Sequence, residues 1–172
     1  MRKNELFWGS LGEGGLILAV AAIGWLVKQP LIFASLGPTA YELIEQPQLR
    51  SARTYNVIVG HLLGVACGFL ALYLMHAWSE PNVLSTGIVS PGRLWAVTIA
   101  ATLTVFCTLL ARAAQPAALA TTLLVALGAM QTRRDAIAIV LGVLIVTALG
   151  QPLRHFRLRS GVQPVGLPSL GS

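Results

Sequence analysis

Four long apolar runs dominate the hydrophobic pattern of this chain. They span residues 11–27, 56–75, 94–111 and 136–153. A helix needs about 20 mostly apolar residues to cross the hydrocarbon core of a membrane, and each run comes close to that length. We therefore expect each of these four runs to form a membrane-spanning helix. No small-residue cleavage site follows the first run at a suitable distance, so it should be a retained helix and not a signal peptide.

Two shorter apolar segments, residues 31–45 and 115–130, lie between the long runs. Both are too short for a full straight span, and each contains a proline, at Gly37-Pro38 and Gln115-Pro116. Proline interrupts a preceding helix and suits the first turn of a new one. The pattern predicts one short, broken or re-entrant helix in each segment, which a membrane tolerates only where protein or water covers it.

The six segments form two sets of three, each in the order long, short, long. Thr39 in the first short segment aligns with Thr121 in the second, and a basic turn follows each. An odd number of crossings per set would place the second set upside down, as in many secondary transporters. We expect an all-α membrane protein with six helical segments, arranged as two inverted three-helix repeats with one half-helix per repeat. The repeats would cover about residues 8–76 and 93–155 of a single transmembrane domain, residues 1–160.

The composition excludes the main soluble classes. Of the 172 residues, 55% are hydrophobic and only 10% are charged, against about 25% charged in typical soluble domains. Disordered chains are poor in apolar residues. The net charge of +6 comes from basic residues that mostly lie between the apolar runs instead of forming one stripe. That distribution is typical of topology signals and not of nucleic-acid binding.

The basic residues favour six crossings with both termini in the cytoplasm. With six crossings, most of the 12 Lys and Arg residues lie on the inner side, whereas four crossings would divide them equally between the two sides. The inner residues would be Arg2, Lys3, Arg50, Arg53, Arg112, Arg154, Arg157 and Arg159. Residues 161–172, which are rich in Gly, Pro and Ser, should form a flexible cytoplasmic tail.

The starts of the two half-helices are the strongest candidates for a binding site. The first backbone N–H groups of a helix lack partners within the helix, and the positive end of the helix dipole lies there, so such an end binds anions. In opposite orientations, both starts could converge on one small anion near the bilayer midplane. Thr39 and Ala40 of the first half-helix, and Ala120, Thr121 and Thr122 of the second, would supply donors. Two ordinary kinked helices are the alternative interpretation.

Other residues in the membrane segments have two interpretations each. Asn56 and His61 could line the pathway or bond to a neighbouring helix, since an unpaired polar side chain in a span is costly. Gly60, Gly64 and Gly68 form a stripe that either lets another helix approach closely or lines a narrow pore.

Glu42 and Glu45 lie three residues apart and share a helix face. They could bind a proton that accompanies an anion, or reach the interface and pair with an Arg. The sequence contains no hydrolase triad, no phosphate-binding glycine loop and no metal cluster with usable spacing. We therefore expect no enzyme activity, no cofactor and no metal.

The sequence resembles the HPP family of small integral membrane proteins over about residues 11–153. Residues 35–47, SLGPTAYELIEQP, are similar to the family's S-F-G-A-S-A, five mostly apolar residues and A-P. Residues 53–61, RTYNVIVGH, resemble its P-R-x-N-V-I-G-G-H and are the most specific part of the match. Residues 115–128, QPAALATTLLVALG, align with the namesake run H-P-P-A-G-A-T-A-L-L-A-V-L-G.

This chain departs from the family pattern at four positions. Gln115 replaces the namesake His, Ala117 the second Pro, Leu119 a Gly, and Pro38 the small residue after Gly37. If the family's His contacts substrate, Gln115 would alter selectivity or coupling. If His only caps the helix, Gln115 could substitute for it.

The resemblance implies anion transport, because plastid and cyanobacterial members are similar to nitrite transporters. We expect a transporter or channel for a small inorganic anion, first nitrite and then nitrate or a relative, in a bacterial inner membrane, with room for a homo-oligomer. The expected site residues are Gly37, Pro38, Thr39, Ala40, Asn56, His61, Gln115, Pro116, Ala120, Thr121 and Thr122. The alternative is a non-transporting membrane subunit or assembly factor that packs through the glycine stripe.

Overall fold

The computed structural model describes residues 3–160, and every regular element in this part of the chain is helical. The elements are α1 (Lys3–Leu26), α2 (Leu36–Glu45), α3 (Thr54–Leu74), the 3-10 helix η1 (Ala77–Ser79), α4 (Val83–Thr86), α5 (Pro91–Leu110), α6 (Pro116–Ala126) and α7 (Arg133–Arg159). The helices α1, α3, α5 and α7 are long and apolar enough to cross a membrane. The prediction of an all-helical membrane protein with four long spans is therefore confirmed. The expected tail, residues 161–172, lies outside the described residues.

The two short apolar segments form α2, with 10 residues, and α6, with 11. Pro116 is the first residue of α6, and Pro38 lies in the first turn of α2. Both positions suit proline, because its missing N–H group would lack a partner there in any case. A helix of this length extends roughly 16 Å, which is about half of the hydrocarbon thickness.

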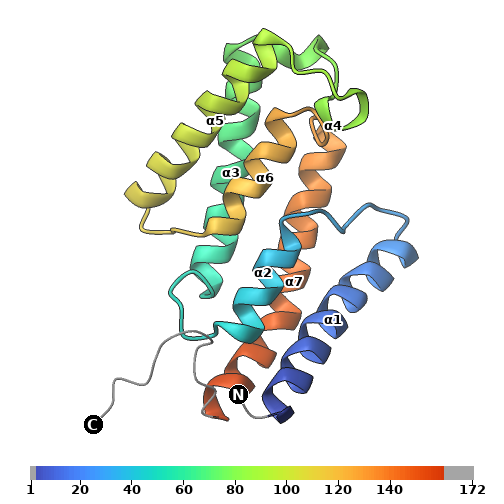
Figure 1. The fold of residues 1–172 in the computed structure, drawn as a ribbon, viewed down its shortest axis with the longest axis vertical. Coiled ribbons are helices and arrows are strands. Elements are labelled where there is room, and N and C mark those ends of the chain that lie inside the picture. The colour runs from blue at the N-terminus through green and yellow to red at the C-terminus, as the bar shows by residue number, and fades with distance from the viewer. Residues whose placement is uncertain (1–2, 161–172) are drawn as a thin grey trace.

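The helices alternate in direction along the chain. In Figure 1, α1, α2 and α3 run up, down and up, and α5, α6 and α7 run down, up and down. The start of α1 and the end of α7 therefore lie at the same end of the molecule. α2 packs against α1 and α7, whereas α6 packs against α3 and α5. α3 also contacts α7, and a small contact joins α2 to α6.

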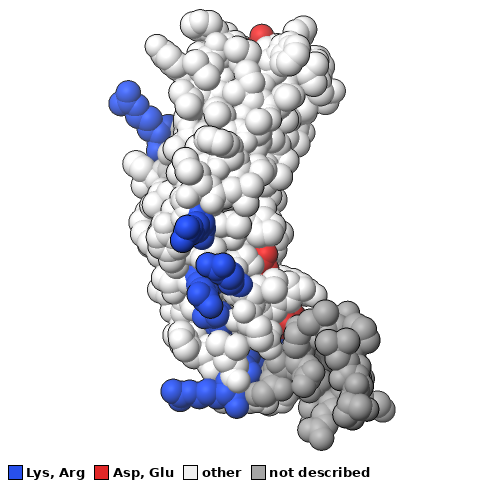
Figure 2. All heavy atoms as spheres, turned by 90° about the vertical axis from the view of Figure 1, so that its left-hand side faces the viewer, with Lys and Arg blue, Asp and Glu red and all other residues white. Residues whose placement is uncertain are grey.

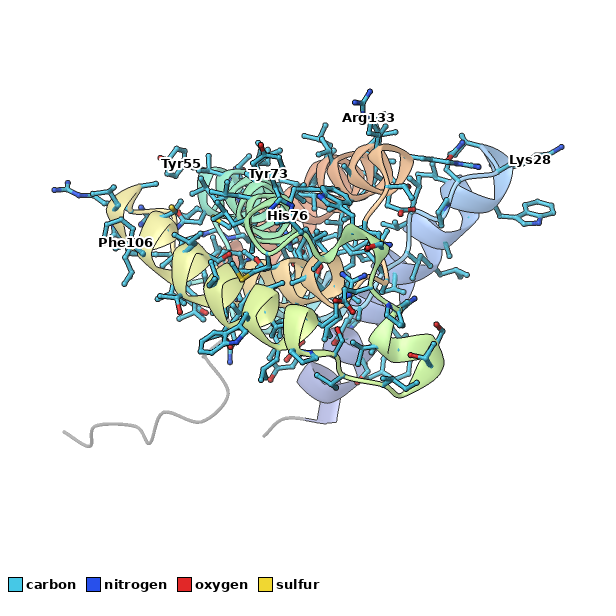
Figure 3. All side chains as sticks on the ribbon, turned by 90° about the horizontal axis from the view of Figure 1, so that it is seen from above. Lys28, Tyr55, Tyr73, His76, Phe106 and Arg133 are labelled. Atoms are coloured by element: carbon cyan, nitrogen blue, oxygen red, sulfur yellow. The ribbon has the colours of Figure 1, made fainter. Side chains whose placement is uncertain are left out.

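Apolar side chains cover much of the outside of this helical bundle. Trp25 is 80% exposed, Leu110 74% and Phe156 68%. Seen from above, Phe106 on α5 points away from the helices, as do Lys28 and Arg133 near helix ends (Figure 3). Water would make so much exposed apolar surface unfavourable, whereas lipid tails accommodate it. The surface is consistent with a position in the membrane.

Basic side chains gather on one face, from mid-height to the lower end in Figure 2. The loops that precede α3 and α6 meet in this region, because Asn56 Nδ2 at the start of α3 donates to Ala114 O at 3.1 Å. Four of the arginines expected on the cytoplasmic side lie in these loops or close to them, namely Arg50, Arg53, Arg112 and Arg154. This grouping agrees with the expected topology, while the orientation in the membrane stays a prediction.

The glycine stripe of α3 packs against α6. A Cβ atom added at Gly60 would lie 2.7 Å from Gln115 Cβ, and one added at Gly64 would lie 2.6 Å from Ala118 O. At Gly68 the nearest atom would be Val125 Cβ, at 2.8 Å. The close-packing interpretation of the stripe is therefore correct, and the pore-lining interpretation is not, because α6 fills the space in front of these glycines.

Two glycines on α7 also allow close helix packing, and they were missed in the sequence. A Cβ at Gly142 would lie 2.6 Å from Leu31 O, and one at Gly150 would lie 2.6 Å from Leu43 Cδ1 of α2. The eight-residue spacing keeps both glycines near one helix face, and this was the signal available in the sequence. α7 thus approaches α2 closely, as α3 approaches α6.

Candidate functional site

Four buried polar side chains from three helices meet where α2 and α6 both contact α3. Ser35 precedes α2, Thr39 lies on α2, His61 on α3 and Thr121 on α6, and each is at most 1% exposed. His61 Nε2 lies 3.0 Å from Thr39 Oγ1, and His61 Nδ1 lies 2.7 Å from Thr121 Oγ1. Ser35 Oγ lies 2.6 Å from Thr121 Oγ1. We call Ser35, Thr39, His61 and Thr121 the polar ring.

The hydrogen bonds of the polar ring run in one direction. The Thr39 hydroxyl donates to the Ser35 carbonyl at 3.0 Å, so its oxygen accepts the proton of His61 Nε2–H. His61 Nδ1 then carries a lone pair and accepts from the Thr121 hydroxyl, which in turn accepts from the Ser35 hydroxyl. This assignment uses every polar hydrogen once with a neutral imidazole. The ring is satisfied by the chain itself, so it is closed.

His61 therefore bonds to both neighbouring half-helices, and it links the two threonines that the repeat pattern aligned. A cavity of about 140 Å³ lies beside the ring between α3 and α7, where His61 shares the lining with apolar residues such as Val65 and Val143. An anion needs donors on its surroundings. The cavity is thus space into which the ring could move and not a binding site in itself.

Thr122 lies beside Thr121 in sequence but points to a different contact. Its hydroxyl lies 2.8 Å from Thr104 Oγ1 of α5 and 3.1 Å from Gly64 O of α3. The structure therefore separates Thr122 from the polar ring. It strengthens the packing of α6 against α3 and α5.

Gln115, Asn56 and Glu42 form a second polar group at the start of α6. Gln115 Oε1 accepts from Ala117 N–H at 3.3 Å, and its Nε2 donates to Ser51 O at 3.3 Å. Asn56 Nδ2 donates to Ala114 O, in the loop that precedes α6. The Glu42 carboxyl lies next to the side chains of Ser51 and Gln115, and its Oε2 is buried without a hydrogen-bond partner. The sequence pattern predicted that Glu42 lies on a short helix, but gave no sign that it lies beside Gln115.

The two half-helix starts pass each other instead of meeting end to end. Ser35, at the start of α2, reaches Thr121 in the second turn of α6. Glu42, in the second turn of α2, lies beside Gln115 at the start of α6. The expectation that both starts converge on one point was therefore wrong in this respect. α2 packs on α7 and α6 packs on α3, and the α3–α7 contact brings the two short helices into overlap.

Most backbone donors at these starts already have acceptors. Leu36 N–H donates to Phe33 O, Pro38 has no N–H, and Thr39 N–H donates to Ser35 O at 3.4 Å. At α6, Pro116 has no N–H, while Ala117 and Ala118 both donate to Gln115. Among the first four residues of each half-helix, Gly37 N–H and Leu119 N–H have no acceptor in the described part of the chain.

The remaining expected site residues differ in position. Ala40 is buried, Gly37 and Ala120 are partly exposed, and Pro38 and Pro116 lie on the exposed side of their helices. The prolines therefore shape the helix starts and do not face the polar ring.

The model of the HPP family, described as "HPP, transmembrane region", matches residues 1–157. The chain belongs to the HPP family. No curated protein and no solved structure matches the chain. As an HPP protein it is a membrane protein, in agreement with its helices and its apolar surface. The family resemblance noted from residues 35–47, 53–61 and 115–128 is confirmed.

Loss of one hydroxyl should weaken the polar ring of this HPP protein measurably. Thr121→Val removes the partner of both Ser35 Oγ and His61 Nδ1 while keeping the side-chain shape. We expect the free energy of unfolding to fall by about 1–2 kcal/mol, measured by reversible unfolding in mixed detergent micelles. Thr102→Val, on an exposed threonine that bonds only to Thr98 O, is the matched control and should change it by less than half as much. Equal effects of both variants would show that the ring adds no stability.

Proposed function

We propose that this protein transports a small inorganic anion across the membrane, nitrite in first place and nitrate or a related anion in second. The observation that carries the proposal is the polar ring, in which His61 joins Thr39 of one half-helix to Thr121 of the other. Polar side chains at this depth in a membrane protein are expensive to bury, and they are usually structural bonds between helices or parts of a pathway. Membership of the HPP family supports the pathway interpretation.

The chemistry of the ring suits a small monovalent anion. Hydroxyl and imidazole N–H groups donate hydrogen bonds without a fixed positive charge, so they can hold an anion and also release it, as conduction requires. When an anion enters, the Ser35, Thr39 and Thr121 hydroxyls can rotate from each other toward it. Gly37 N–H, which has no acceptor, lies close to them in sequence and adds a backbone donor.

Two inverted repeats account for the pattern of helix contacts. In such a pair of repeats α1 corresponds to α5, α2 to α6 and α3 to α7. The α3–α6 contact then corresponds to α7–α2, the α3–α5 contact to α7–α1, and the α5–α6 contact to α1–α2. All of these contacts are present. The two sets also run in opposite directions (Figure 1). In this proposal, both termini are cytoplasmic, in a bacterial inner membrane.

The alternative of a non-transporting subunit or assembly factor has lost one of its two contact surfaces. That interpretation used the glycine stripe of α3 and the chain termini as surfaces for another protein. α6 of the same chain covers the stripe at Gly60, Gly64 and Gly68. A homo-oligomer would have to use another face of the bundle.

Anion flux into liposomes that contain the purified protein tests the transport proposal. We expect selective uptake of nitrite over chloride and formate, with nitrate intermediate, and we expect Thr39→Val to reduce it to the level of empty liposomes, because Thr39 joins His61 to α2. Thr98→Val is the matched control, since Thr98 is exposed on α5 and bonds only to Leu94 O, and it should leave flux unchanged. Folded protein with no flux of any of the four anions would contradict the proposal.

A further inference from the structure

Glu42 is a buried carboxyl group that the hydrogen-bond pattern leaves incomplete. The residue is 8% exposed and lies on α2, between the polar ring and the loop that precedes α3. Its neighbours are the side chains of Ser51 and Gln115, and Oε2 accepts no hydrogen bond. An ionised carboxylate offers only acceptors, so this arrangement does not satisfy it fully.

No cation compensates for a negative charge on Glu42. Among the described residues the ion pair is Glu45 with Arg157, at 3.1 Å. The charged and titratable groups on the elements around Glu42 have other contacts or positions. On α7, Arg157 bonds to Ile44 O and Arg154 bonds to Pro47 O. Glu13 of α1 lies near Glu45, His61 of α3 belongs to the polar ring, and α6 has no charged residue. The remaining groups are exposed, namely Tyr41, Tyr55, Arg50, Arg53 and Arg112.

The position of this carboxyl group opposes anion binding while it is ionised. Glu42 lies seven positions after Ser35, which corresponds to roughly 10 Å along the helix. Glu42 also lies directly beside the residue that caps the start of α6. At such distances in a site with little water, two negative charges repel each other strongly. An anion in the polar ring and a charge on Glu42 therefore disfavour each other.

We propose that Glu42 takes up one proton for each anion that binds in the polar ring, so that the protein moves nitrite together with a proton. This inference rests on the proposed transport function. On the entry side an O–H bond of hydronium breaks, leaving water, as an O–H bond forms at the Glu42 carboxylate, so its negative charge disappears before or as the anion enters. On the exit side this O–H bond of Glu42 breaks and the proton passes back to water as the anion leaves. Thermodynamic linkage makes the effect reciprocal: the bound anion favours the protonated carboxyl group by the same factor. One anion and one proton together carry no net charge.

Liposomes with purified protein, an internal pH-sensitive dye and a clamped membrane potential test this proposal. Downhill nitrite entry should bring in one proton per nitrite above the level in empty liposomes, and its rate should not depend on the potential. Glu42→Gln, which mimics the protonated form, should move nitrite more slowly, with proton uptake per nitrite near zero and with a dependence on the potential. Glu42→Asp should keep the coupling. Glu13→Gln, a membrane-helix carboxyl group away from the ring, is the matched control and should behave as the wild type.

The outcomes separate this proposal from the proposed function. Nitrite flux without protons in the wild type overturns the coupling role and leaves transport intact. Equal proton uptake per nitrite in the wild type and Glu42→Gln overturns it as well. Absence of nitrite flux in the folded wild type overturns the transport function and, with it, the coupling. If Glu42→Gln does not fold, the proton measurement on the wild type and the Glu42→Asp variant decides.

Discussion

Replacing Arg93 with Gln should lower the free energy of unfolding by about 3–5 kcal/mol, because it removes a charged donor from a site built around it. The Arg93 side chain is fully buried. Its guanidinium donates to the carbonyl oxygens of Glu80, Pro81 and Ala126 and to Gln131 Oε1, at 2.7–3.2 Å. Ala126 O lies at the C-terminal end of α6, where the helix dipole favours a positive charge. Without the guanidinium, Ala126 O would stay buried without this donor, and the partly exposed acceptors at Glu80, Pro81 and Gln131 would lose their charged partner.

Unfolding in mixed detergent micelles, followed by tryptophan fluorescence, measures this change. Arg93→Lys keeps the charge but cannot reach all four acceptors, so it should recover only part of the loss. Arg133→Gln is the matched control. Arg133 is exposed and points away from the helices (Figure 3), and a positive charge at the start of α7 is unfavourable for the dipole. A decrease below about 1 kcal/mol for Arg93→Gln, the net value of a single ordinary hydrogen bond, would contradict this account.

Gly64→Leu should have the second-largest effect, with a loss of about 3 kcal/mol from overpacking. A Cβ at this position would lie 2.6 Å from Ala118 O and 3.0 Å from Thr122 Oγ1. The first of these atoms belongs to the backbone of α6 and cannot rotate away, so α6 must move from α3. That movement would also pull Thr121 from His61. The better helix propensity of Leu, worth about 1 kcal/mol relative to Gly, offsets only part of the loss.

The chain offers a matched control for Gly64→Leu on another long helix. No atom lies within 4 Å of a Cβ added at Gly14 on α1. Gly14→Leu should therefore leave the free energy of unfolding unchanged or raise it, in the same micelle titration. Equal stability of the two variants would mean that α6 does not press against the glycine stripe in the membrane.

Local patterns predicted the helices of this protein because helix length and helix starts depend on nearby residues. The apolar runs predicted α1, α3, α5 and α7, and the prolines at positions 38 and 116 predicted where the short helices begin. The alignment of Thr39 with Thr121 predicted that they have related positions, and both contact His61. These properties follow from composition, spacing and turn chemistry.

The mutual position of the helices could not be predicted in the same way. How far α2 overlaps α6 depends on packing between distant segments, such as Gly64 against Ala118, which local patterns do not encode. For the same reason Ser35 was missed, although its hydroxyl completes the ring. Arg93 was interpreted only as a topology signal, since its acceptors Glu80 and Gln131 are remote in sequence. Its place in the first turn of a helix, where a positive charge is unfavourable, was the available hint.

Each of the two buried arginines ties a short helix to a long one, and the helix contacts group the molecule into two units. Arg157 ties the end of α2 to α7, and Arg93 ties the end of α6 to α5. By their contacts, α1, α2 and α7 form one unit and α3, α5 and α6 the other, so that each unit contains helices from both halves of the chain. Three features join the units: the polar ring, the small α2–α6 contact, and the α3–α7 contact with its apolar cavity. Rotation of one unit against the other along the α3–α7 contact would open the ring and leave both half-helices bonded to their arginines.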